Sequence, residues 1–167
     1  MVVYKLLNDE QEKEEYDKID YQLIAIHTTL EDYRLAYQIN KCLPIVLSKS
    51  HSNISISHKN TEIQFVRFVF EDETALVNWN LIKNKNEFSS ENLTVNTGLF
   101  ANSKSQISTK TYFIPEFKKV DFFLKIGINV SPLEFENTLL QLKKIDNIST
   151  VYTVDPETIK SKINLIF

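Results

Sequence analysis

The fold is decided by residues 120–145, VDFFLKIGINVSPLEFENTLLQLKKI, which predict a strand followed directly by a helix. Apolar residues dominate 120–128 and fill every second position, as in a strand that packs on a core. Ser131 is a favourable helix N-cap, and Pro132 and Glu134 occupy positions that favour a helix start. We expect this helix to run to about residue 145.

An earlier stretch has the same order of elements. Residues 21–26, YQLIAI, predict a strand, and residues 30–43 predict a helix that ends at Pro44. Thr28 and Thr29 stand where they can cap this helix. The two strand–helix units suggest halves of a split βαβ arrangement, as in ferredoxin-like folds. We therefore predict an α+β fold with a single mostly antiparallel sheet and two main helices.

Three strands are predicted between these units, at 53–58, 62–70 and 74–82, with short polar turns that favour an antiparallel meander. Residues 62–70, EIQFVRFVF, are apolar on both faces, which is typical of a central strand. Two shorter strands are expected at 111–114 and 150–154, and a helical turn follows the second of these. The sheet is thus assembled from segments along most of the chain.

The length of the chain suits a single domain over residues 1–167. Its start, 1–20, is an acidic lead-in, because residues 9–20 carry seven carboxylates and two lysines. Residues 83–110 are rich in Asn, Ser, Lys and Thr, and they predict a long polar loop with one apolar pair, Leu99–Phe100.

The overall composition excludes several classes of function. A net charge of −3 and only two arginines, Arg34 and Arg67, disfavour DNA binding. Two glycines cannot form a glycine-rich phosphate loop, and no apolar run of about 18 residues is present to cross a membrane. A single cysteine, Cys42, fits a reduced cytoplasm. We expect a cytoplasmic protein without a cofactor.

Residues 114–122, IPEFKKVDF, resemble the signature of the IPExxxVDY family, a group of small Bacteroidetes proteins. Phe122 stands where the family has tyrosine, so the ring is kept and the hydroxyl is lost. A second block, residues 32–41 (DYRLAYQINK), is also similar to the family. The resemblance implies no established activity.

The signature predicts a strand–turn–strand corner, because Pro115 favours an extended residue before it. Glu116 lies in the turn, and Asp121 points away from the strand face that carries Val120. These carboxylates either accept hydrogen bonds from turn amides and pair with Lys118 and Lys119, or form a paired-acid site for a metal or a proton transfer. No histidine lies nearby in the sequence, which favours the structural role.

His27, Thr28 and Thr29 lie between a predicted strand and a predicted helix, where α/β proteins often bind ligands. An anion on the helix amides and a simple helix cap both explain the two threonines. The three histidines lack metal-ligand spacing, and Cys42 suits a core position. We predict no metal site and no catalytic residue.

The first helix carries a second stripe opposite its predicted core face. This stripe is the candidate interaction face, since tyrosine and arginine are enriched at protein interfaces: Leu30, Tyr33, Arg34, Tyr37 and Lys41. The alternatives are that the loop at 83–110 covers it, or that Arg34 pairs with Glu116 or Asp121.

These features lead to a predicted non-enzymatic adaptor that binds a protein partner or itself. A second hypothesis is RNA association through interleaved lysines and aromatics: Lys104, Lys110, Tyr112, Phe113, Phe117, Lys118, Lys119, Phe122, Phe123 and Lys125. A third is small-molecule sensing or catalysis at His27, Thr28, Asn129 and Ser131, which rests on fold analogy.

Overall fold

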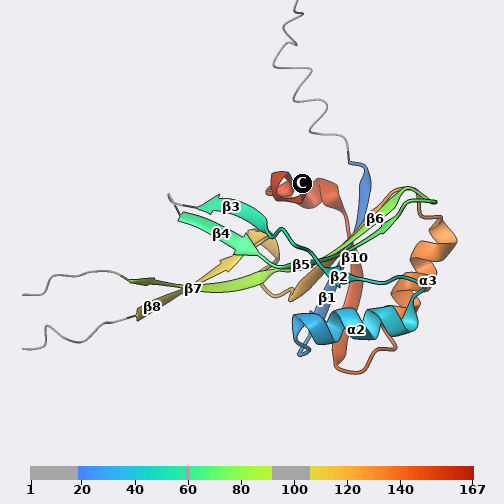
Figure 1. Ribbon diagram of the computed structural model, residues 1–167, viewed down its shortest axis with the longest axis horizontal. Coiled ribbons are helices and arrows are strands. Elements are labelled where there is room, and N and C mark those ends of the chain that lie inside the picture. Colours follow the sequence, from blue (N-terminus) through green and yellow to red (C-terminus); the bar gives the residue numbers. More distant parts are fainter. Residues whose placement is uncertain (1–18, 59–60, 92–105) are drawn as a thin grey trace, which may run out of the picture.

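A six-stranded antiparallel sheet forms the centre of the part of the chain that the structure, a computed structural model, describes: residues 19–58, 61–91 and 106–167 (Figure 1). All neighbouring strands in this sheet are antiparallel. From one edge to the other the strands are β10 (Ile148–Val154), β1 (Tyr21–Thr28), β9 (Phe122–Gly127), β6 (Val77–Lys83), β5 (Arg67–Asp72) and β2 (Ser48–Lys49).

The two α-helices of the described residues, α2 (Asp32–Cys42) and α3 (Pro132–Leu142), pack on one face of the sheet. Leu35 and Ile39 of α2 and Leu142 of α3 are buried there with apolar residues of the strands, in a cluster that we call the helix-side core. Burial of one apolar stripe per helix is what stabilises short helices in a folded protein. The predicted α+β fold, with a main antiparallel sheet and two main helices, is confirmed.

The start of α3 confirms the predicted N-cap at Ser131, which forms a capping box with Glu134. The Ser131 hydroxyl accepts a hydrogen bond from the Glu134 amide at 3.3 Å, and the Glu134 carboxylate accepts one from the Ser131 amide at 3.0 Å. Pro132 occupies the first turn, where its missing N–H costs nothing. These local contacts fix where the helix begins.

The prediction that Thr29 caps the first helix is wrong. Glu31 is the N-cap residue of α2, and its side chain makes no capping hydrogen bond. The Thr28 hydroxyl instead accepts from the Leu30 amide at 3.1 Å and donates to the Asn147 carbonyl at 2.8 Å. The amide of Thr29 also donates to Asn147. The two threonines therefore join β1 to the turn before β10 rather than capping α2.

The other face of the sheet is covered by short elements. These are the hairpin of β3 (Ile54–His58) and β4 (Thr61–Phe65) and the 3-10 turns η1 (Pro115–Phe117), η2 (Pro156–Thr158) and η3 (Lys162–Leu165). In Figure 1, β3, β4 and the C-terminal turns lie above the sheet and α2 lies below it. The buried residues on this side form a second cluster, which we call the outer core.

The prediction of one central strand over residues 62–70 is wrong. The chain breaks at Val66 into β4 and β5, which belong to different sheets. Phe65 joins the outer core and Phe68 joins the helix-side core, so the apolar residues on both faces serve two layers. Strands β1 and β9, buried on both faces, occupy the centre instead.

The prediction of a polar loop over residues 83–110 is wrong at both ends of that segment, where the chain forms strands. Residues Lys85–Glu91 form β7 and Gln106–Tyr112 form β8, and the two strands pair in a separate antiparallel ribbon that extends from the body of the molecule (Figure 1). The predicted strand at 111–114 is correct only for Thr111 and Tyr112, which end β8, whereas Phe113 and Ile114 form a bend before η1. The apolar pair Leu99–Phe100 and most of the acidic lead-in lie outside the described residues.

The split βαβ arrangement is present in the second half of the chain. Strands β9 and β10 both run antiparallel to β1, which lies between them, and α3 connects the two. The first unit, β1 and α2, continues to β2 at the far edge of the sheet, so β9, β6 and β5 lie between its two strands.

Candidate functional site

The outward face of α2 carries an aromatic and cationic surface, which we call the tyrosine ridge: Tyr33, Arg34, Tyr37 and Lys41. Tyr33 is 58% exposed and Tyr37 is 61% exposed. The Arg34 guanidinium carbon lies 5.8 Å from the centre of the Tyr33 ring, and the Lys41 ammonium lies 5.7 Å from that of Tyr37. Each cation therefore lies near an aromatic ring, and this contact reduces the side-chain entropy that the cation loses on binding a partner.

One residue of the predicted interaction face does not belong to it. Leu30 is partly buried and packs against the helix-side core. It precedes the N-cap Glu31, so the spacing of a continuous helix does not apply to it. The exposed stripe consists of the four ridge residues.

The signature forms a closed corner of the fold, residues 113–122, around the buried side chain of Asn84. The Asn84 side-chain amide donates to the carbonyls of Phe117 and Val120, both at 2.9 Å. Its side-chain oxygen accepts from the Ile114 amide at 2.9 Å. The backbone of Asn84 is bound to the same corner at both its N–H and its carbonyl. One buried asparagine therefore satisfies the turn that the signature encodes, which we call the signature corner.

The two signature carboxylates have separate partners. Asp121 accepts from the Thr28 amide at 2.9 Å and from the Lys85 ammonium at 2.6 Å. Glu116 accepts from the amide and the hydroxyl of Ser161, each at 2.7 Å. Because these partners lie on different elements, the geometry gives each carboxylate a structural role. The ion-pair partner of Asp121 is Lys85, not the predicted Lys118 or Lys119.

The pKa of Glu116 reflects this contact. Burial alone would raise the pKa, but hydrogen bonds from the Ser161 hydroxyl and from backbone amides outweigh it, and the pKa lies below its ordinary value. The ionised form is therefore the one that holds the C-terminal turn. The remaining signature residues fit the same picture: Pro115 opens η1, and the Phe122 ring is buried in the helix-side core.

The predicted ligand residues do not come together. The His27 ring stacks on Tyr152 with their centres 5.7 Å apart, and Thr28 uses its amide and hydroxyl within the fold. Asn129 and Ser131 follow the end of β9 that pairs with Tyr21, whereas His27 lies near the other end of β1. Residues 27–29 and 129–131 are therefore at opposite ends of the sheet.

The aromatic side chains of the RNA hypothesis are mostly internal. Phe113, Phe122 and Phe123 are buried, and Phe117 packs against the outer core. Tyr112 is partly exposed near Lys118, and Lys104 lies outside the described residues. Bases stack on exposed rings, so this segment does not provide a stacking surface on the sheet.

Cys42 is a partly buried thiol that donates to the Ile39 carbonyl at 3.4 Å. Burial raises its pKa, which is the opposite of what activates a nucleophile. Among residues 19–58, 61–91 and 106–167, no group of three His, Cys, Asp or Glu side chains is arranged to hold a metal. Over the same residues, no helix is long and apolar enough to span a membrane.

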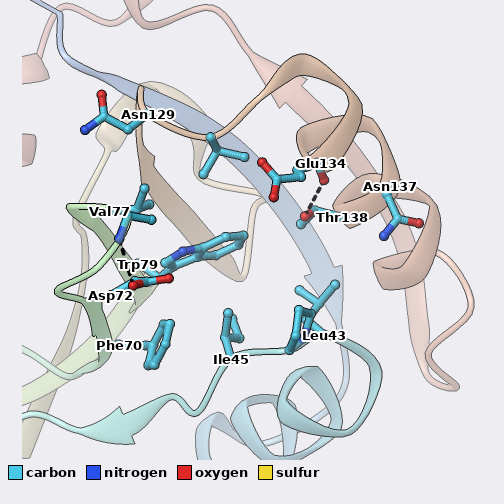
Figure 2. Close-up of a pocket in the computed structure, with 13 residues that line it drawn as sticks. Leu43, Ile45, Phe70, Asp72, Val77, Trp79, Asn129, Glu134, Asn137 and Thr138 are labelled. Atoms are coloured by element: carbon cyan, nitrogen blue, oxygen red, sulfur yellow. Dashed lines mark hydrogen bonds between the residues drawn. The ribbon is translucent and has the colours of Figure 1, made fainter.

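A cavity of about 160 Å³ lies between the end of α2, the β5–β6 turn and the start of α3 (Figure 2). Apolar side chains, including those of Trp79 and Phe70, line part of it, and polar side chains line the rest. The carboxylates at its rim serve their own backbone: Asp72 accepts from the amides that follow it, and Glu134 caps α3. Because both carboxylates accept hydrogen bonds from backbone amides, the cavity does not resemble a catalytic site.

In comparisons with known proteins, no family model, no curated protein and no solved structure matches the chain. The functional reading therefore depends on the residues themselves. Sequence reasoning missed Asn84 and Lys85, because both fall in the segment predicted as a loop. The position of Asn84 directly after the apolar strand that ends at Lys83 could have indicated that its side chain is buried.

Proposed function

We propose that this protein is a non-enzymatic, cytoplasmic interaction module whose tyrosine ridge binds an acidic surface of a protein partner. The observation that carries the proposal is the exposure of Tyr33 and Tyr37, 58% and 61%, on a helix whose opposite face is fully buried. Large aromatic side chains that remain in water on a rigid helix are the kind of residue that dominates binding energy at interfaces.

The charges of the ridge favour a different protein over a second copy as the partner. Arg34 and Lys41 place two positive charges among the exposed tyrosines. Two such ridges facing each other would bring like charges together, and that contact is unfavourable. Carboxylates on the partner would instead pair with both cations while its apolar groups cover the rings.

A binding role also fits the chemistry of the other candidate residues. The Glu116 and Asp121 carboxylates hold backbone amides in place, and the Cys42 thiol has a raised pKa. These groups support the fold, whereas the ridge residues contribute little to it.

The experiment compares partners that co-purify with the tagged wild-type chain and with a Tyr33→Ala/Tyr37→Ala variant, after nuclease treatment. Ile163→Ala is the matched control, because Ile163 is 72% exposed and lies on the opposite side of the sheet. We expect one protein to be lost with the ridge variant and retained with the control. The purified pair should then bind about tenfold more weakly through the variant, and more weakly at high salt. Equal retention by all three chains would contradict the proposal.

A further inference from the structure

The outer face of the sheet changes from apolar to polar across β5, β6 and β9. The register places Val69, Asn80 and Lys125 side by side on this face. Arg67 and Asn78 lie on it as well, because side chains two residues apart on a strand share a face. The outer core covers Ile82 and Phe123 further along the same strands, but this polar part borders a groove.

Two cations in this region share an aromatic ring. The Arg67 guanidinium carbon lies 4.9 Å from the centre of the Phe167 ring, and the Lys125 ammonium lies 4.4 Å from it. Lys125 also donates to the Leu165 carbonyl at 2.6 Å. Among the described residues the ion pairs are Lys85–Asp121 and Lys110–Glu87, so neither Arg67 nor Lys125 has a carboxylate partner.

Lys125 and Arg67 differ in the charges that surround them. Burial lowers the pKa of Lys125, the charge of Asp20 opposes that shift, and the charge of Arg67 adds to it. Two positive groups in a half-buried site repel each other, and aromatic rings offset that repulsion only in part. For Lys125, the attraction of Asp20 exceeds the repulsion of Arg67, so Arg67, which lines the groove, is the cation that an anion there would pair with.

The guanidinium is already oriented for such an anion. Its Nε donates to the Ser52 carbonyl at 3.2 Å, one terminal nitrogen donates to the Ser52 hydroxyl at 3.2 Å, and the other lies 3.4 Å from the Asn80 oxygen. Arginine has five N–H groups in a fixed plane, so donors remain for a ligand. A fixed fork loses little entropy when it binds a tetrahedral oxyanion.

The groove has a volume of about 460 Å³, which is in the range of small-molecule sites. It lies between the segment Ser48–Ser52 and strands β5 and β6. Its polar lining consists of hydroxyls, amides and cations with one carboxylate: Ser48, Lys49, Ser50, His51, Ser52, Arg67, Glu71, Asn78 and Asn80. Phe167 adds a half-exposed ring.

We propose that this groove binds a small phosphate-bearing molecule, with the Arg67 guanidinium holding the phosphate. The amides of Asn78 and Asn80 contact the polar body of the ligand, and the Phe167 ring packs against its less polar part. Phosphate matches the arginine fork in geometry, and its hydrogen bonds to the guanidinium are charge-assisted. The site lies on the face opposite the tyrosine ridge and is independent of the proposed function.

The test is calorimetric titration of the full chain with inorganic phosphate, adenosine monophosphate and uncharged adenosine. We expect adenosine monophosphate to bind with a Kd of about 1 mM or tighter, phosphate to bind more weakly, and adenosine to give no signal. Arg67→Leu should weaken binding at least about tenfold, and Arg67→Lys should restore only part of it. Lys144→Ala, an exposed lysine at the end of α3, should bind as the wild type does.

A double variant keeps the test informative if Arg67→Leu fails to fold. Ser52 and Asn78 are exposed and line the groove, so Ser52→Ala/Asn78→Ala should fold normally and still weaken binding severalfold. Unchanged binding in this variant, or no binding of any phosphate compound, would overturn the proposal. A ten-nucleotide single-stranded RNA should bind no more tightly than adenosine monophosphate. Tighter binding with a steep salt dependence would assign the phosphate to nucleic acid and overturn the small-molecule site.

Discussion

The signature corner and the tyrosine ridge both stand out in the sequence, but they direct their polar groups differently. In the corner, Asn84 makes three side-chain hydrogen bonds to residues 114–120, and Asp121 and Glu116 bind backbone amides elsewhere in the fold. On the ridge, Tyr33 and Tyr37 extend into solvent with their cations beside them. The polar side chains of the corner are hydrogen-bonded within the chain, whereas the ridge side chains are largely exposed to solvent.

This difference illustrates two reasons why a sequence carries distinctive residues: one is the stability of the fold, and the other is binding. A buried polar group must be hydrogen-bonded, so a turn that crosses the core requires particular residues at particular positions. An exposed aromatic residue has no such requirement in the folded monomer, and its presence is better explained by something that covers it. Stability and binding measurements should therefore respond in opposite ways at the two regions.

The largest expected effect is that of Asn84→Ala. The change leaves the Ile114 amide and the Val120 carbonyl without their buried partner, whereas the Phe117 carbonyl still accepts from the Val120 amide. We expect a loss of about 4 kcal/mol in the free energy of unfolding, since each unsatisfied buried group costs about 1–3 kcal/mol and relaxation recovers part of it. Urea unfolding measures this loss. Asn137→Ala, at an exposed asparagine of α3, is the control, and an equal effect in both would contradict a structural corner.

The next largest effect is expected at Asp121. Asp121→Ala should lower the free energy of unfolding by about 2 kcal/mol, because the Thr28 amide loses its acceptor. Lys85→Ala should cost about 0.5 kcal/mol, because the Lys85 side chain is 43% exposed and water can replace the pair. The double variant gives the coupling between the two residues. A larger loss for Lys85→Ala than for Asp121→Ala would show that the ion pair, rather than the amide contact, holds the corner to β1.

The Glu116 contact predicts a dependence of stability on acid. Its pKa in the folded protein is lowered, so the stabilisation is present above the ordinary glutamate pKa of about 4.3 and is lost as the pH falls through the lower folded value. Glu116→Gln should be less stable than the wild type at pH 7, and the two should converge below that range. Urea midpoints at pH 7 and at about pH 3 measure this. A constant difference at both pH values would exclude the ionised carboxylate as the cause.

The smallest effect on stability is expected on the ridge. Tyr33→Ala and Tyr37→Ala should each change the free energy of unfolding by no more than about 0.5 kcal/mol, because both side chains are largely in solvent. The same urea experiment measures it. A loss of about 2 kcal/mol or more would show that the tyrosines stabilise the monomer, and the contrast with the corner would disappear.

Much of the fold can be predicted from local sequence patterns. The capping box at Ser131 and Glu134 and the alternation along β9 are determined by residues close together in the chain, and the structure has both. The break at Val66 is different. An apolar run over 62–70 looks like one buried strand, and nothing in its pattern shows that Phe65 and Phe68 enter different cores.

The sites were less predictable, because they depend on contacts between distant residues. The exposure of Tyr33 and Tyr37 follows from the helical spacing of α2. The role of Asn84 does not, because its partners lie in residues 114–120 and are brought to it by the pairing of β6 with β9. The meeting of Arg67 with Lys125 over one ring also arises only when the sheet is assembled.

The account depends most on the claim that the tyrosine ridge is a binding face, and photocrosslinking in cells tests this most directly. A benzophenone amino acid replaces Tyr37 in one chain and the equally exposed but distant Ile163 in another. The account predicts one discrete protein adduct from position 37 that is absent from position 163 and is reduced by Arg34→Ala. The same adducts from both positions, or none from position 37, would contradict it.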